Sequence, residues 1–273
     1  MPLWTPPPFP YTVELSARTG VTITGAGTAH VKGTWTSVIA ATAKDAYGFW
    51  TSVAGANVAA AVTAQLIDFG VGPTDPPEII INNLNAGATE TNSTGGAGFG
   101  RVHYWPCFIP AGSKIWARNQ GLIVSDTSLI HVSLNTEMPY GAHIMENVTT
   151  YGAVTASSRG TPVTSGAAAY GSAVRLTNTA TTRDHRAWHV SIGQNADTTV
   201  VQQFGLQVQL LIGSGSTGPI GPWLWGASAT EILNGPFPPI PIYQPVPVGA
   251  EIWCRVLAGA TSDSYDVICY GLD

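Results

Sequence analysis

The sequence predicts an all-β protein built from two tandem, duplicated antiparallel β-sandwich domains of jelly-roll type, preceded by an extended proline-rich arm. Short runs rich in β-branched and aromatic residues recur roughly every 8–12 residues between Gly, Pro, Asn and Thr, as in sandwiches and barrels. One ten-residue pattern occurs twice, at 109–118 and 246–255, about half a chain length apart. So long a period indicates two copies of a domain, because solenoid repeats span about 20–50 residues.

The elements follow in chain order. Residues 1–10 contain five prolines, which exclude a helix or a central strand, so we expect 1–18 to form the extended arm. The first sandwich is then expected at 19–135, a linker at 136–152, and the second sandwich at 153–273. The Ala-rich stretch 53–65 is interpreted as strand, because its counterpart at 201–210 alternates polar and apolar residues.

The repeated pattern predicts a tight turn that leads into a core strand. Proline fixes φ and glycine permits a positive φ, so Pro-x-Gly suits the turn. The following Ile-Trp-x-Arg strand directs Trp and Arg to one face, where they can stack or pack against a partner domain. The residues that define the repeat are Pro110, Gly112, Trp116 and Arg118 in the first copy and Pro247, Gly249, Trp253 and Arg255 in the second.

Three further segments align between the copies. Residues 44–50 match 183–189, which aligns Asp45 with Asp184, and 64–70 match 207–213. After the Ile-Trp-x-Arg strand, 128–134 match 265–271 as closing strands. The small drift in spacing is what loop insertions produce, which favours a true duplication.

Composition excludes several function classes. Charged residues make up 10% of the 273, the net charge is −5, and no Lys/Arg cluster occurs, so nucleic-acid binding is not expected. Hydrophobic residues reach 44% with 9 Trp, enough material for two cores. A chain with so few charges is expected to cover part of its surface by assembly.

Compartment signals are sparse. No apolar run is long enough for membrane insertion, and the N-terminus lacks the basic and apolar regions of a secretory signal. We therefore expect synthesis in the cytosol, with Cys107, Cys254 and Cys269 as buried free thiols.

No constellation of residues predicts catalysis, a metal or a cofactor. His185 and His189 are four residues apart, but no third metal ligand is spaced with them. Asp68, Asp75 and Glu78 are candidate acid/base carboxylates, yet nothing fixes their separation. No catalytic sequence motif occurs, so the chain is predicted not to be an enzyme.

Two tryptophans are the best candidates for a contact site. Trp223 and Trp225, if extended, share one face of a strand. Exposed, they would stack on sugar rings. Buried, they would be core residues or an intersubunit contact, and the sequence leaves both alternatives open.

The segments 19–24, 27–35, 43–48 and 108–118 resemble a family of small β proteins encoded by tailed bacteriophages and prophages. The resemblance covers residues 19–134 and extends more weakly to the second copy. Members of the family are virion structural proteins, and the matching motifs are turn-and-strand signatures that bring no catalytic residue.

The resemblance implies a non-enzymatic virion structural protein that assembles as a homo-oligomer at the tail tip, baseplate or fibre attachment. Its expected partners are other copies of itself and other virion proteins. Capsid decoration is the first alternative, and a receptor module that binds a host glycan through Trp223 and Trp225 is the second.

Overall fold

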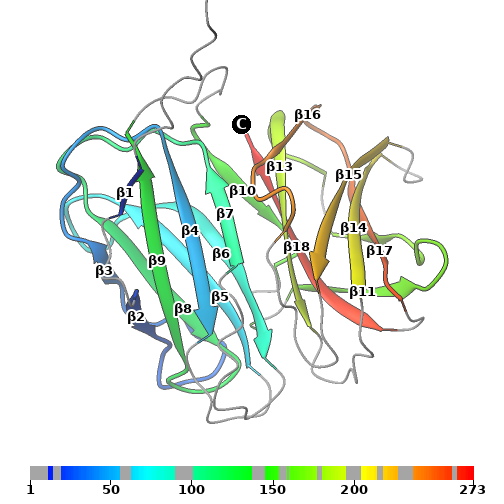
Figure 1. Cartoon of the computed structure of the whole chain (residues 1–273), viewed down its shortest axis with the longest axis horizontal. Helices are drawn as coiled ribbons and strands as arrows, with labels where there is room; N and C mark the ends of the chain where they lie inside the picture. Colours follow the sequence, from blue (N-terminus) through cyan, green and yellow to red (C-terminus); the bar gives the residue numbers. More distant parts are fainter. Residues whose placement is uncertain are drawn as a thin grey trace, which may run out of the picture.

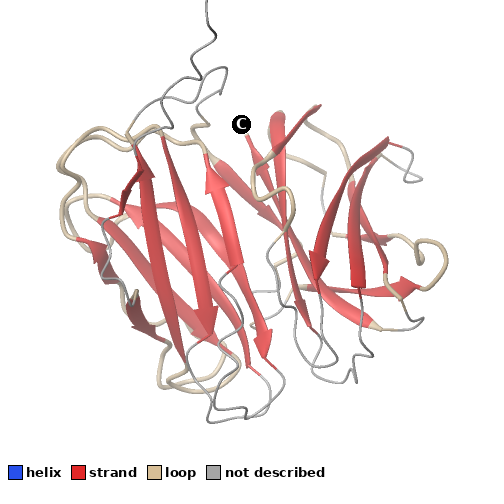
Figure 2. Cartoon of the chain, viewed as in Figure 1, coloured by secondary structure: helices blue, strands red, loops and turns tan. Residues whose placement is uncertain are grey.

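The computed structural model describes residues 12–14, 20–55, 63–89, 101–136, 145–153, 158, 160–176, 180–194, 204–213, 218–226, 236–259 and 263–273. Within these ranges the chain forms strands and loops and no helix (Figure 2). The strands make two sandwiches side by side, one from each half of the chain (Figure 1). The predicted all-β, sandwich-type fold class is confirmed.

The first sandwich packs two antiparallel sheets. One sheet has the order β1–β9–β4–β7, with β2 also paired to β9. Its strands are β1 (Thr12–Glu14), β2 (Val21–Thr24), β4 (Gly48–Gly55), β7 (Arg101–Trp105) and β9 (Thr127–Asn135). The other sheet has the order β3–β8–β5–β6. Its strands are β3 (Thr36–Ile39), β5 (Thr63–Val71), β6 (Glu78–Thr89) and β8 (Ile115–Gly121). Large buried side chains such as Phe49 and Phe69 fill the space between the sheets.

The second sandwich is one continuous nine-stranded sheet. Strand β11 pairs antiparallel with β18 and parallel with β17, which joins the two layers. The strands are β10 (Val148–Tyr151), β11 (Thr161–Gly166), β12 (Val174–Arg175), β13 (His185–Gln194), β14 (Phe204–Ile212), β15 (Gly218–Gly226), β16 (Ile242–Val246), β17 (Ile252–Leu257) and β18 (Ser264–Leu272).

Strand pairing in the second half repeats that of the first. Strand β9 pairs with β1, β2 and β4, and β18 pairs with β10, β11 and β13. Strand β8 pairs with β3 and β5, and β17 pairs with β12 and β14. The pairs β4–β7 and β5–β6 correspond to β13–β16 and β14–β15. Adding nine to a strand number therefore gives its counterpart; descent from one ancestral copy remains a prediction.

The repeated strands have the predicted two-residue alternation. In β8, Ile115 and Ala117 are buried while Trp116 and Arg118 are partly exposed. Strand β17 alternates in the same way, with Ile252 buried. The stretch 53–65 also contributes strand at both ends, to β4 and β5, and residues 56–62 lie outside the described residues.

Two predicted boundaries need correction. Residues Thr12–Glu14, assigned to the arm at 1–18, pair with β9 of the first sandwich. Residues Val148–Tyr151, assigned to the linker at 136–152, pair with β18 of the second. Both segments complete a sheet, since each supplies backbone hydrogen bonds to a neighbouring strand. The described residues contain no helix long and apolar enough to cross a membrane.

Candidate functional site

The second sandwich covers the end of the first where the edge strands β6 and β7 lie (Figure 1). The covering strands are β10, β13 and β18. Ala187, Ile268, Tyr270 and Leu272 are fully buried and pack with the core of the first sandwich rather than with that of their own. One apolar core therefore continues across the junction, and the two sandwiches form a single packed body.

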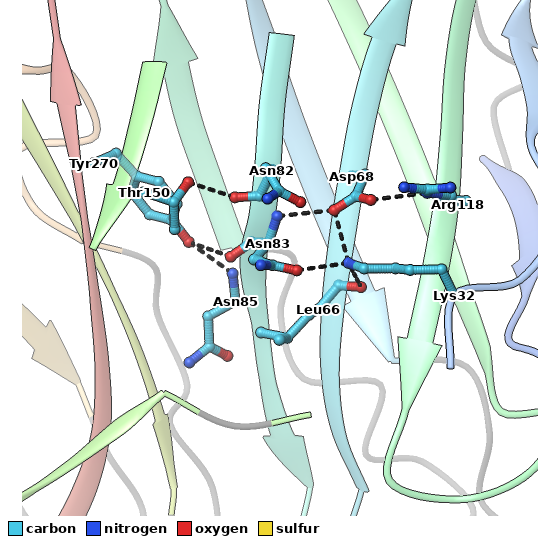
Figure 3. Close-up of polar contacts among 9 residues, drawn as sticks. All are labelled: Lys32, Leu66, Asp68, Asn82, Asn83, Asn85, Arg118, Thr150 and Tyr270. Atoms are coloured by element: carbon cyan, nitrogen blue, oxygen red, sulfur yellow. Dashed lines mark hydrogen bonds and ion pairs between the residues drawn. The ribbon is translucent and has the colours of Figure 1, made fainter. Parts of the chain in front are cut away.

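Hydrogen bonds from the second sandwich satisfy backbone groups of edge strand β6 (Figure 3). The Tyr270 hydroxyl donates to the Asn83 carbonyl at 3.0 Å and accepts from the Asn85 amide at 2.8 Å. Beside it, the Thr150 hydroxyl donates to the Asn82 carbonyl at 2.5 Å. An uncovered edge of this kind is a site of unwanted strand pairing, so these bonds protect β6 as well as fixing the junction.

A buried carboxylate stands on the other side of β6 (Figure 3). Asp68 Oδ1 lies 2.7 Å from Lys32 Nζ and accepts the Asn83 amide at 2.9 Å, and Asp68 Oδ2 lies 2.8 Å from Arg118 Nε. Lys32 also donates to Asn83 Oδ1 at 2.7 Å. The Arg118 guanidinium stacks over the Trp35 ring at 4.4 Å. Both cations thus contact the one carboxylate, and Asn83 links the cluster to Tyr270.

This arrangement gives Asp68 a structural role instead of an acid/base role. Burial lowers the pKa of Lys32, and the adjacent Asp68 carboxylate opposes the shift. The other two candidate carboxylates, Asp75 and Glu78, are exposed. The sequence-based idea of a catalytic carboxylate pair with Asp68 therefore finds no support among the described contacts.

Two buried histidines cross the junction in opposite directions. His103 Nε2 lies 3.3 Å from the Val190 carbonyl, and His189 Nε2 lies 2.7 Å from the Tyr104 carbonyl. Burial lowers the pKa of His189 to about 4, against the effect of its bond to Tyr104. His189 is therefore neutral near pH 7 and ties β13 to β7.

The other candidate metal ligand has a different neighbour. His185 Nε2 lies 2.5 Å from the Tyr151 hydroxyl. No group of three His, Cys, Asp or Glu side chains that could hold a metal ion occurs in the described part of the chain. Cys107, Cys254 and Cys269 are free, and burial raises the pKa of Cys107 to about 12.

The Pro-x-Gly segments form matching turns. Thr42 donates its hydroxyl to the Pro110 carbonyl at 2.8 Å, and Thr181 does the same to the Pro247 carbonyl at 2.9 Å. Both threonine hydroxyls also accept the backbone amide of the residue after the turn glycine, at 3.1 and 3.0 Å. The alignment of the two copies in the sequence began at residues 44 and 183 and so did not include these threonines. Each threonine nevertheless lies three residues before the aligned aspartate of its copy.

The aspartates and glycines complete the same turns. Asp45 and Asp184 each accept the amide of the residue between Pro and Gly, at 2.8 and 2.7 Å. Gly112 has φ 81° and Gly249 has φ 85°, in the left-handed region that favours glycine. The alignment of Asp45 with Asp184 thus has a structural cause.

The repeated arginines also have matching environments. Arg255 Nε donates to Gln209 Oε1 at 2.8 Å. Gln209 lies opposite Arg255 in the strand register, just as Asp68 lies opposite Arg118. The Arg255 guanidinium stacks over Tyr170 at 4.5 Å. Each arginine therefore stacks on a ring from elsewhere in its sandwich, whereas the sequence left open stacking on the tryptophan of its own strand or packing against a partner domain.

Trp223 and Trp225 share a face, as predicted, but that face is the interior. Both indoles are buried in the core of the second sandwich, and Leu224 between them is exposed. The glycan-stacking interpretation required exposed rings, so the structure favours the packing alternative.

A cluster of exposed apolar side chains lies on β15, β16 and the segment between them. Leu224 and Phe237 pair through two backbone hydrogen bonds of 3.0 and 2.9 Å, and Ile240 and Tyr243 follow. Phe237 is 69% exposed and Ile240 47% exposed. We call Leu224, Phe237, Ile240 and Tyr243 the β15–β16 strip.

Comparisons with known proteins identify no family. No family model matches the chain and no curated protein matches it. Among solved structures, it is similar to PNGase F, a glycosylasparaginase from Flavobacterium meningosepticum, with 11% identity, a TM-score of 0.39, and 96% of this chain and 95% of that chain covered. A recombinant peptide N-glycanase F gives 10% identity, a TM-score of 0.37 and the same coverage. A complex of the plant peptide RALF23 with FER and LLG2 gives 8% identity and a TM-score of 0.23, covering 85% of this chain and 82% of that chain.

These comparisons correct one prediction. The sequence, which lacks a recognisable catalytic motif, was interpreted as that of a non-enzymatic protein, yet two matches that span nearly the whole chain are to an enzyme. The non-enzymatic assignment is therefore withdrawn. Because the TM-scores and identities are low, the likeness assigns no reaction to this chain.

Proposed function

We propose that the chain is a structural protein of a tailed-bacteriophage particle, assembling as a homo-oligomer at the tail tip, baseplate or fibre attachment. The resemblance of residues 19–134 to phage virion proteins supports the setting. The β15–β16 strip is the observation that carries the assembly, since exposed apolar clusters of this kind mark interaction surfaces.

The internal repeat indicates what covers the strip. By their pairing, β15 and β16 are the counterparts of β6 and β7, and a neighbouring sandwich covers the β6–β7 end. At the equivalent end of the second sandwich, Phe237, Ile240 and Tyr243 are exposed, while Pro239 between them accepts the Tyr104 amide of the first sandwich at 2.8 Å. A sandwich from another copy packed on this end would repeat the contact within the chain. Such head-to-tail contacts generate rings or filaments.

Light scattering coupled to size-exclusion chromatography tests the assembly. The wild-type chain is expected to associate with rising concentration, and Phe237→Ser with Ile240→Ser is expected to give a monomer. Val124→Ser, which alters an exposed side chain on the first sandwich, should leave association unchanged. A wild-type chain that stays monomeric at every concentration, or a double variant that associates as well as wild type, would overturn the proposal.

Antibody labelling of particles tests the location. Gold particles at the tail tip or baseplate are expected. Label spread over heads would instead support capsid decoration, and particles without label would reject a virion role.

A further inference from the structure

A cavity of about 370 Å³ opens beside the junction. Strands β4, β5, β6 and β7 and the segment 106–110 of the first sandwich form most of its wall, and Leu272 of β18 and the segment 145–148 close it from the second. Its volume lies at the lower end of the range for small-molecule sites, about 300–1,000 Å³. The cavity thus has room for a small ligand.

Backbone hydrogen bonds hold the cavity open in one shape. The Met145 amide donates to the Pro106 carbonyl at 2.6 Å, and the Glu146 amide donates to the Asp273 carbonyl at 3.0 Å. Behind the lining residues Phe108 and Pro110, Ile109 exchanges two bonds of 2.8 Å with Ala46. A wall fixed from both sandwiches is pre-organised, so binding there does not require costly ordering of loops.

The wall chemistry defines the ligand class. Phe49 and Trp105 are buried aromatic side chains, and Phe108 is partly exposed. Two exposed carboxylate side chains, Glu78 and Glu146, come from opposite sandwiches and line the same cavity. Apolar walls favour an apolar or aromatic body, while carboxylates and aromatic faces both attract a cation.

We propose that this cavity binds a small organic cation, an ammonium group joined to an aromatic or aliphatic body. The body occupies the space lined by Phe49 and Trp105, and the ammonium group lies between Glu78 and Glu146. The site is independent of the β15–β16 strip, so its failure would leave the assembly proposal untouched.

Matched probes test the charge requirement. Phenethylamine and its neutral analogue 2-phenylethanol are titrated into the full chain by calorimetry at low salt. We expect saturable binding of phenethylamine that weakens as salt is added, because exposed charge pairs are screened. Binding of 2-phenylethanol should be at least tenfold weaker. Equal affinities, or no saturable binding of phenethylamine, would overturn the proposal.

Matched variants locate the site. Glu78→Gln with Glu146→Gln should weaken phenethylamine binding about tenfold and leave that of 2-phenylethanol unchanged. Asp75→Asn removes a nearby exposed carboxylate outside the cavity lining and should change neither. Ile80→Trp places a larger side chain in the wall and should abolish binding of both probes. Unchanged binding by the double glutamine variant would contradict the assignment.

Discussion

Single buried polar side chains decide how the two sandwiches are held together. His189 occupies a fully buried position and bonds the Tyr104 carbonyl of the other sandwich. Its protonation would place a charge where water cannot reach it, which is why its pKa falls. Asp68 is also fully buried, but Lys32 and Arg118 both contact its carboxyl oxygens. Removing the Asp68 carboxylate would leave two neighbouring cations without their shared partner.

Stability should therefore depend on pH through His189. Its folded pKa of about 4 lies below an unfolded value of about 6.5, so between these values the unfolded chain binds the extra proton. Stability is then fully present above pH 6.5 and is lost as the pH falls toward 4, by about 3 kcal/mol. Urea unfolding across this range measures the loss.

His189→Gln should flatten that dependence. The variant should keep part of the pH dependence, because burial also lowers the pKa of His185. Protonation of His185 in the unfolded chain therefore destabilises the fold in the same direction. An unchanged pH profile in the variant would contradict this account of His189.

At the scale of elements, the most regular feature is the Pro-x-Gly turn before β8 and β17. In both copies a threonine, an aspartate and a glycine at positive φ fix the turn. The turn sets the register of a strand whose buried side chains, Ile115 and Ile252, enter the two cores. The same local solution occurs in both sandwiches although the surrounding sequences differ.

Gly112→Ala and Gly249→Ala should each destabilise the chain by about 1 kcal/mol. An added Cβ meets no atom within 4 Å at either position, so the cost is the backbone strain of a positive φ alone. Gly27→Ala is the control, because it has equal space and no positive φ. Chemical unfolding of the three variants measures the difference, and a loss at Gly27 equal to the others would refute the turn argument.

The sequence predicted these elements because local patterns encode them. The Pro-x-Gly pattern at Pro110 and Pro247 and the alternation around Ile115 can be read from nearby residues, although distant threonines and aspartates complete the turns. The junction was not predicted, because Tyr270 and Asn83 meet through a contact between distant segments. Trp223 and Trp225 were correctly placed on one shared face. Strand periodicity does not show whether that face is interior or exposed until the opposite sheet is known.

At the scale of the whole molecule, the shared core makes the two halves interdependent. Tyr270 and Leu272 lie on β18 of the second sandwich, but their side chains pack in the core of the first sandwich. A second sandwich separated from the first would expose these side chains to water. We therefore expect one cooperative unfolding transition in calorimetry, with agreement between the calorimetric and van't Hoff enthalpies.

Tyr270→Phe should lower stability by about 2 kcal/mol, because it removes the two bonds with Asn83 and Asn85 in a buried junction. The transition should then broaden or split as the halves uncouple. Tyr47→Phe, which retains the ring contact with Phe108, serves as the control. Two well-separated transitions in the wild-type chain would contradict the shared core.

Strand β18 has a consequence for synthesis. It is the common partner of β10, β11 and β13, and it follows all three in the chain, so it leaves the ribosome after them. Until it emerges, those three strands lack their shared neighbour, and the finished first sandwich has an open apolar end. A nascent chain paused before Ser264 should therefore recruit chaperones that hold exposed apolar surface, and release from them should coincide with completion of β18.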